Sequence, residues 1–201
     1  MEVDVIPGEE EGRLAYVAVL SSLGLSGGSV VIFDTGGGST QFTFGHGAAV
    51  DDRFSLNVGA ARLTEQFALG GVVGDGQLAR ALAGIAAEFS RLDAASPPET
   101  LVGMGGAVTN LIAIKLGLAT YDAEAVQGSV LERAEVDRQI ELYRTRGVEE
   151  RRQIVGLQPP RAEVILAGAC VVRTVLEKLG KESLRVSDRG VRHGLLVDRF
   201  G

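Results

Sequence analysis

The sequence of 201 residues has very little cysteine and few aromatic residues. Cys170 is its only cysteine, so no disulfide framework forms within the chain, and the apolar neighbours of Cys170 favour a buried structural thiol over a nucleophile. Tryptophan is absent and aromatic residues make up 5%, which leaves no evident stacking surface for single-stranded nucleic acid. These absences argue against a disulfide-stabilised secreted domain and against DNA as a partner.

Long apolar runs and an excess of positive charge are absent as well. No apolar run approaches the roughly 18 residues of a membrane-spanning helix, and the acidic start, residues 1–4, has no apolar core of a signal peptide. We therefore expect a cytoplasmic protein with no membrane partner. The net charge of −6 means that local donors, rather than the overall field, would have to hold an anionic ligand.

Glycine, in contrast, is abundant, with 28 residues, and three glycines stand together after a short apolar run. Val30 to Phe33 has the length and β-branched content of a buried strand that ends at the carboxylate Asp34. Gly36 to Gly38 and Ser39 follow, and from Gln41 the alternation of polar and apolar residues predicts a second strand. Backbone N–H groups at such a hairpin tip can cradle an oxyanion, and the carboxylate beside them can hold a divalent cation.

A plain glycine-rich turn explains the triplet alone equally well. Two common phosphate loops are excluded, because no Gly-Lys-Ser/Thr follows the glycines and because the element after them is a strand rather than a helix.

A second glycine pair follows another apolar run. Leu101 to Met104 predicts a strand, Gly105-Gly106 a turn, and residues 108–116 a helix. A strand and a glycine pair that lead into a helix N-terminus form an anion or nucleotide site by geometry. Close packing of the strand against the helix is an equally good explanation of the two glycines.

The motif Asp34-Thr35-Gly36-Gly37-Gly38-Ser39-Thr40 resembles the phosphate loop of the exopolyphosphatase and guanosine pentaphosphate phosphohydrolase family, within the actin, sugar kinase and Hsp70 superfamily. Four further stretches match that family in the same order along the chain. Ordered matches over nearly the whole chain are far more specific than one glycine loop. The four stretches are residues 8–14, 56–64, 103–111 and 187–196.

This resemblance implies an α/β fold of the ribonuclease-H-like type, with a mixed five-stranded sheet and helices on both faces. It implies that residues 1–24, a strand and a glutamate-bearing helix, lead from a missing N-terminal actin-like domain, and that residues 25–201 form the second actin-like domain. Periodicity alone predicts only an α/β mixture. It also predicts a strand over residues 3–6, a loop over 121–132 and a peripheral, highly charged helix over 133–146.

The activity that the resemblance implies is Mg²⁺-dependent hydrolysis of a terminal phosphoanhydride of inorganic polyphosphate or guanosine pentaphosphate. Glu11 aligns with the family's catalytic glutamate, which would orient or activate the attacking water. Asp34 and Gln41 occupy the metal-binding positions, and Arg189 and Arg192 could neutralise phosphate, although exposed surface arginines are the default interpretation. The implied phosphate-binding residues are Gly36, Gly37, Gly38, Ser39, Gly105, Gly106 and Arg13.

The chain departs from the family pattern at three points. Gln41 stands where the family has a metal-binding glutamate, so one negative charge is lost and the affinity for the metal should fall. His193 replaces a glutamate in the closing motif, between Arg192 and Gly194. The chain also matches only the second half of the family's two-domain catalytic core.

These departures leave other functions open. A non-catalytic half-domain that binds polyphosphate or a nucleotide for regulation is the main alternative, and an actin-like kinase or ATPase fragment is another. If the half-domain is active, it works alone, as a homodimer, or with the missing N-terminal domain. The sequence does not distinguish polyphosphate from guanosine pentaphosphate as the substrate.

Overall fold

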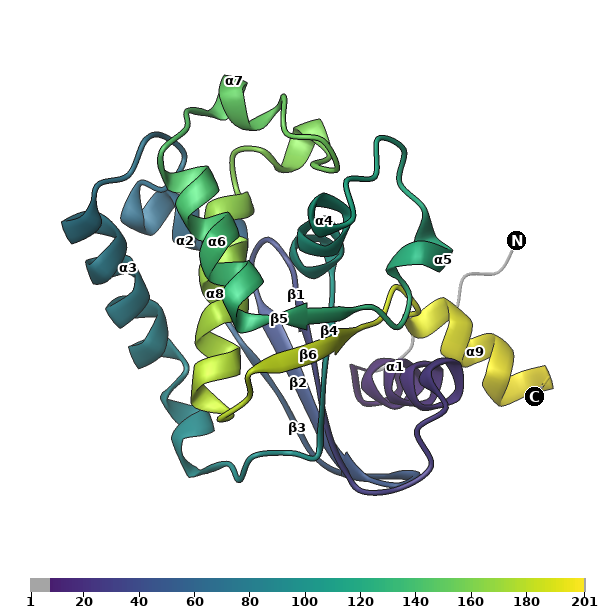
Figure 1. The fold of residues 1–201 in the computed structure, drawn as a ribbon. Helices are drawn as coiled ribbons and strands as arrows, with labels where there is room; N and C mark the ends of the chain where they lie inside the picture. The colour runs from purple at the N-terminus through teal and green to yellow at the C-terminus, as the bar shows by residue number, and fades with distance from the viewer. Residues whose placement is uncertain (1–7, 201) are drawn as a thin grey trace.

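The computed structural model describes residues 8–200, apart from the side chains of residues 8, 9 and 11, so the strand expected over residues 3–6 lies outside the described part. A mixed six-stranded sheet runs through it in the order β3-β2-β1-β4-β6-β5 (Figure 1). β1, β4 and β6 are parallel, β2 and β3 continue β1 as antiparallel strands, and β5 is antiparallel to β6. The strands are β1 (Ser29–Thr35), β2 (Thr40–His46), β3 (Ala49–Leu56), β4 (Thr100–Met104), β5 (Val130–Glu132) and β6 (Ser183–Val186).

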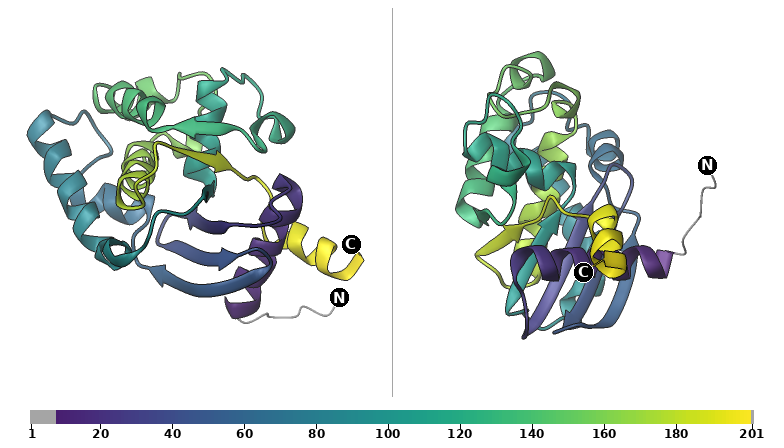
Figure 2. Two further views of the ribbon diagram at one scale, coloured as in Figure 1. Left: turned by 60° about the horizontal axis from the view of Figure 1, so that its bottom comes forward. Right: turned by 90° about the vertical axis from the view of Figure 1, so that its right-hand side faces the viewer.

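Helices cover both faces of the sheet, as expected. Figure 2 shows α1 and α9 on one side and α3 and α8 on the other. No helix within residues 8–200 is long and apolar enough to cross a membrane. The helices are α1 (Gly8–Leu23), α2 (Ala60–Phe67), α3 (Asp75–Glu88), α4 (Gly106–Lys115), α5 (Ala123–Val126), α6 (Arg133–Arg144), α7 (Val148–Arg151), α8 (Ile165–Lys178) and α9 (Val191–Phe200), with 3₁₀ turns at Ser90–Ala94 and Pro159–Arg161.

The middle of the central strand β1, Val30 to Phe33, is apolar because both faces of the strand are covered there. Val31 and Phe33 point into the larger core, which α2, α3, α4, α6 and α8 also fill. Val30 and Ile32 point to the other face, where they pack with Tyr16 and other apolar residues of α1. The strand therefore reaches its carboxyl end, at Asp34, as a rigid element.

The expectation of a five-stranded sheet is wrong, because a short edge strand adds a sixth. β5 lies within residues 121–132, where the sequence pattern predicts a loop, and α5 lies there too. With three residues β5 is too short to show alternation, and only its central Leu131 is buried. It is a strand because β6 offers an edge to pair with, which places Leu131 opposite Leu184.

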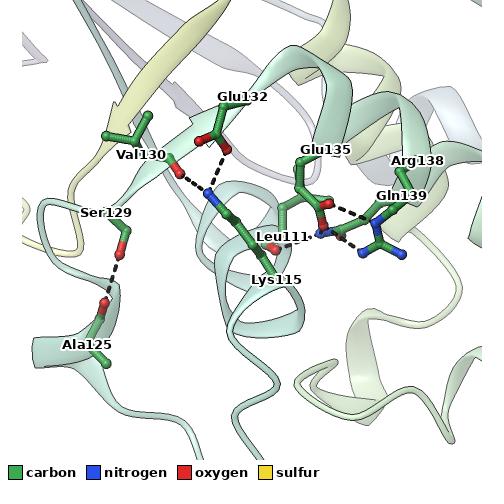
Figure 3. Close-up of polar contacts among 9 residues, drawn as sticks. All are labelled: Leu111, Lys115, Ala125, Ser129, Val130, Glu132, Glu135, Arg138 and Gln139. Carbon is green, nitrogen blue, oxygen red and sulfur yellow. Dashed lines mark hydrogen bonds and ion pairs between the residues drawn. The ribbon is translucent and has the colours of Figure 1, made fainter.

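Figure 3 shows the hydrogen bonds that join this edge strand to α4 and those that join α6 to α4. Lys115 Nζ, at the end of α4, donates to the Val130 carbonyl at 2.7 Å and to the Glu132 carboxylate at 2.6 Å. Gln139 Nε2 on α6 donates to the Leu111 carbonyl of α4 at 2.8 Å. These contacts join the β5 edge, α4 and α6 into one unit.

Helix α6 is not peripheral, although its many charges predict that. Val136, Ile140 and Tyr143 are buried in the larger core, where α6 packs against α8. The charges lie on the other side of the helix, where pairs three residues apart, such as Arg138 with Glu135, satisfy one another. The pattern is that of an amphipathic helix with a narrow apolar stripe.

Helix α8 is the centre of the larger core. The apolar pattern predicts a buried helix over residues 161–179. The observed helix is shorter, Ile165–Lys178, and eleven of its fourteen residues are buried. A Cβ atom on Gly168 would lie 2.7 Å from the Ala107 Cβ, so this glycine lets α8 approach α4 closely. Cys170 is fully buried, and burial raises its thiol pKa to about 12, which confirms a structural cysteine rather than a nucleophile.

One arginine is also fully buried, and backbone carbonyls hold it. Arg151 donates to the carbonyls of Tyr143 at 2.9 Å, Leu69 at 3.1 Å, Ala162 at 3.4 Å and Gly71 at 2.6 Å. Burial lowers the pKa of its guanidinium. The side chain therefore joins α6, the turn after α2 and the segment before α8.

We expect Arg151→Met to destabilise the domain by at least about 2 kcal/mol, because it leaves several buried carbonyls without donors. The measurement is the midpoint and slope of urea unfolding. Arg152→Met is the matched control, since Arg152 is exposed and pairs with Glu149 three residues before it. It should change stability by less than about 0.5 kcal/mol. Equal effects of the two substitutions would contradict a structural role for Arg151.

Candidate active site

The first glycine loop joins β1 to β2 and is closed by one backbone hydrogen bond, from the Gly36 N–H to the Ser39 carbonyl at 2.9 Å. The strands on either side are in register, with Asp34 opposite Gln41. Behind the loop, the buried Thr40 hydroxyl donates to the Val58 carbonyl at 2.6 Å. The loop is therefore a defined hairpin tip with an exposed carboxylate at its base.

Helix α2 fixes the direction of the loop's peptide groups. The Ala60 and Ala61 N–H groups donate to the Gly36 and Gly37 carbonyls, each at 2.9 Å. In a trans peptide the N–H points opposite to the carbonyl, so the N–H groups of the next residues, Gly37 and Gly38, point away from α2. Such outward N–H groups are what a phosphate oxygen needs.

The second glycine loop touches the first. Gly105 has a φ of +91°, and a Cβ there would overlap the Thr35 carbonyl and lie 2.6 Å from the Asp34 Oδ1. The next residue, Gly106, begins α4, and a Cβ on it would lie 2.6 Å from the Arg161 Nη2. Glycine is thus required at Gly105, where the backbone of the first loop comes close, while at Gly106 it leaves room for the Arg161 guanidinium.

A cavity of about 420 Å³, which we call the α4 pocket, opens at this junction. Its walls come from the carboxyl ends of the three parallel strands β1, β4 and β6, which is where ligands bind in open α/β sheets. The residues that line it include Asp34, Gly105, Gly106, Tyr121, Arg161, Asp188, Arg192 and His193.

The α4 pocket combines positive and negative groups. The N-terminus of α4 contributes N–H groups that have no partner within the helix and a partial positive charge, and Arg161 and Arg192 contribute two guanidinium groups. Asp34 and Asp188 contribute carboxylates. Burial, together with a hydrogen bond to Asp188, raises the pKa of Tyr121. This phenol therefore stays protonated and lines the pocket as a hydrogen-bonding group.

A second cavity of about 420 Å³, the sheet pocket, adjoins the first on the face of the sheet that carries α1. Polar side chains of β2 and β3 form much of its floor, and Asp34, Met104 and Val191 line both cavities. Asp34 therefore stands at the boundary between them.

The two residues expected at the metal lie side by side. Asp34 and Gln41 are directly opposite on β1 and β2, and Gln41 Nε2 donates to the Ser39 hydroxyl at 2.9 Å, which leaves the Gln41 Oε1 as a ligand atom. Among the described residues no three His, Cys, Asp or Glu side chains gather to hold a metal ion. This sparse oxygen donor set fits Mg²⁺, which keeps several waters when bound.

The arginines named from the sequence lie in different places. Arg13 donates to Glu10 at 2.7 Å and to Asp198 at 2.9 Å, so it links α1 to α9, and it lowers the pKa of both carboxyls. Arg189 pairs with Glu124. Arg192, in contrast, lines the α4 pocket. The side chain of Glu11, on α1, lies outside the described part of the chain.

Three residues of these cavities that can bind a ligand, Arg161, Tyr121 and Arg53, are among those that the sequence did not indicate. Tyr121 comes from an irregular segment, where no period indicates which way a side chain points. Arg161 lies in a 3₁₀ turn before α8, whereas the sequence pattern predicts it at the start of the helix over residues 161–179. Arg53 could have been predicted, because strand alternation places it on the same face of the sheet as Ser55, which is the cross-strand neighbour of Gln41.

The chain resembles known proteins over nearly its whole length. A model of the Ppx/GppA phosphatase family matches residues 1–201. Exopolyphosphatase 2 of Mycobacterium tuberculosis is 30% identical over 217 residues, which cover 98% of this chain and 64% of that protein. The guanosine-5'-triphosphate,3'-diphosphate pyrophosphatase of Photobacterium profundum is 30% identical over 204 residues, which cover 98% of this chain and 39% of that protein.

The solved structure of the Aquifex aeolicus PPX-GPPA enzyme superposes with a TM-score of 0.91 at 36% identity, over 99% of this chain and 66% of that one. The match confirms the α/β, actin-like fold with a mixed sheet. The chain spans less than two thirds of the length of each of these relatives. Because the family model matches the whole of residues 1–201, the chain belongs to the Ppx/GppA phosphatase family.

Proposed function

We propose that this domain provides one half of a phosphoanhydride hydrolase that releases terminal phosphate from inorganic polyphosphate or guanosine pentaphosphate with Mg²⁺. One observation carries the proposal: the two glycine loops meet at Asp34, above the ends of the parallel strands. Donors for phosphate oxygens and a carboxylate for a divalent cation are thereby brought to one point, which is the requirement for phosphoryl transfer.

The phosphate would be bound from two sides. The N–H groups of Gly37 and Gly38 and the Ser39 hydroxyl face it from the first loop. The N–H groups at Gly106 and the Arg161 guanidinium beside them face it from the second. Donors that are fixed before the reaction stabilise the charge of the transferring group without further reorganisation.

Asp34 and the amide oxygen of Gln41 would hold Mg²⁺, which neutralises charge on the phosphate oxygens when it is bound. Glu11 is assigned as the carboxylate that orients or deprotonates the attacking water. Arg13 is a phosphate ligand only if it leaves Glu10 and Asp198, its partners in this structure.

The domain boundary and the location of the protein belong to the same proposal. Residues 1–24 lead from an N-terminal actin-like domain, residues 25–201 form the second, and catalysis takes place in the cytoplasm. The other wall of the cleft comes from that domain or from a second copy in a homodimer. Without it, the α4 and sheet pockets stay open to water, which weakens electrostatic catalysis.

One observation favours a second function, a non-catalytic half-domain that binds polyphosphate or a nucleotide for regulation. Gln41 lies at the metal position without a negative charge, so Asp34 supplies the only carboxylate among the described residues that line the sheet pocket. A regulatory half-domain would bind these anions and release no phosphate.

We expect the 201-residue chain to release phosphate from long-chain polyphosphate only when Mg²⁺ is present, and Glu11→Gln to reduce the rate at least about a hundredfold, the usual contribution of a general base. Glu10→Gln, the neighbouring carboxylate that pairs with Arg13, is the matched control and should keep most of the activity. A folded chain that binds polyphosphate but releases no phosphate, even after an N-terminal actin-like domain is added back, would support the regulatory alternative.

We expect Gln41→Glu to tighten Mg²⁺ binding at least about fivefold, because a second carboxylate next to Asp34 adds a charged oxygen ligand. Isothermal titration of Mg²⁺ into the protein measures this without any need for turnover. Gln153→Glu, which adds the same charge at an exposed position after α7, should leave the affinity unchanged. No difference between the two variants would show that Gln41 is not at the metal position.

A further inference from the structure

The floor of the sheet pocket is a polar patch on an otherwise apolar sheet face. In the strand register, Asp34 lies beside Gln41, and Gln41 beside Ser55; one step further along the sheet, Thr43 lies beside Arg53. All five line the sheet pocket. Towards the start of β1 the same face is apolar and covered by α1. The polar patch therefore lies at the edge of the area that α1 covers, and Gly12 and Ala15 of that helix form one wall of the pocket.

The chemistry of the patch suits an anion. It offers an amide, two hydroxyls and a guanidinium, all of which can donate hydrogen bonds. Asp34, at the boundary with the α4 pocket, is the only acidic residue among the described residues that line it. The chain as a whole is acidic, with a net charge of −6, so a cavity in which hydrogen-bond donors outnumber acidic groups differs from the rest of the protein.

The Arg53 side chain lies close against the backbone of α1 at Gly12. A Cβ on Gly12 would lie 2.5 Å from Arg53 Nη1 and would overlap its Cδ, so the arginine side chain lies along the backbone of the helix. Gly12 follows Glu11, the proposed catalytic residue, directly. The guanidinium is thus kept at the edge of the reaction site by a glycine that leaves room for it.

The two cavities form a path for an extended ligand. Asp34, Met104 and Val191 line both, and each cavity measures about 420 Å³. A volume of this size lies within the usual range for small-ligand sites. A ligand with several phosphate groups can therefore place one group at the glycine loops and others along the floor of the sheet pocket.

We propose that the sheet pocket is a second phosphate subsite, which takes the further phosphate groups of a condensed phosphate chain, with Arg53 as its specificity-determining contact. The inference rests on the proposed function, because the first phosphate group is assigned to the glycine loops. The subsite makes the domain select condensed phosphates of three or more units over orthophosphate. Arg53 binds the condensed phosphate and takes no part in breaking its phosphoanhydride bond.

The experiment compares the binding of orthophosphate and of inorganic tripolyphosphate by isothermal titration in Mg²⁺. It uses Glu11→Gln protein, so that tripolyphosphate is not consumed. Adding Arg53→Gln should weaken tripolyphosphate binding at least about tenfold, the cost of losing a charge-assisted hydrogen bond, and leave orthophosphate binding within about twofold. Arg53→Lys should restore part of the difference. Arg80→Gln removes the same charge from the exposed face of α3 and should change neither affinity.

The outcomes separate this inference from the proposed function. If orthophosphate binds but tripolyphosphate binds no more tightly, or if Arg53→Gln leaves tripolyphosphate binding unchanged, the second subsite is refuted while the first stands. If neither ligand binds, the glycine-loop site fails and the inference fails with it. Circular dichroism establishes that each variant is folded. If Arg53→Gln does not fold, Arg53→Ser replaces it. An unchanged preference of Arg53→Ser for tripolyphosphate over orthophosphate would likewise refute the subsite.

Discussion

The parallel pairing of β1 with β4 is the constraint on which the candidate site depends. It places Asp34 opposite Met104, so the turns after the two strands begin side by side. Those turns can touch only because Gly105 adopts a φ of +91° and carries no side chain that would meet Asp34. One register and one glycine therefore bring the carboxylate, the hairpin N–H groups and the α4 N-terminus together.

The two sides of the sheet serve this site differently. On one side, buried α8 and its close contact with α4 at Gly168 form a rigid support for the second glycine loop. On the other, α1 covers only part of the sheet and leaves a polar floor beside Asp34. The site is thus rigid behind the glycine loops and open in front of them.

Local patterns predicted the elements that build the site, and tertiary contacts decided the rest. The run Val30 to Phe33 and the glycines after it were sufficient to predict the hairpin. β5 was not predictable, because its three residues become a strand only by pairing with β6. The position of Arg161 was equally hidden, since it depends on a 3₁₀ turn that lies beside Gly106 through folding rather than through sequence spacing.

The most direct test of the convergence of the two loops is a ¹⁵N-edited NMR titration of the chain with orthophosphate in Mg²⁺. If both loops bind one phosphate, the amide signals of Gly37, Gly38 and Gly106 shift together, with one dissociation constant. The amides of the turn at residues 70–71, outside both cavities, should stay still. Shifts confined to one loop, or different constants for the two, would contradict a single site at Asp34.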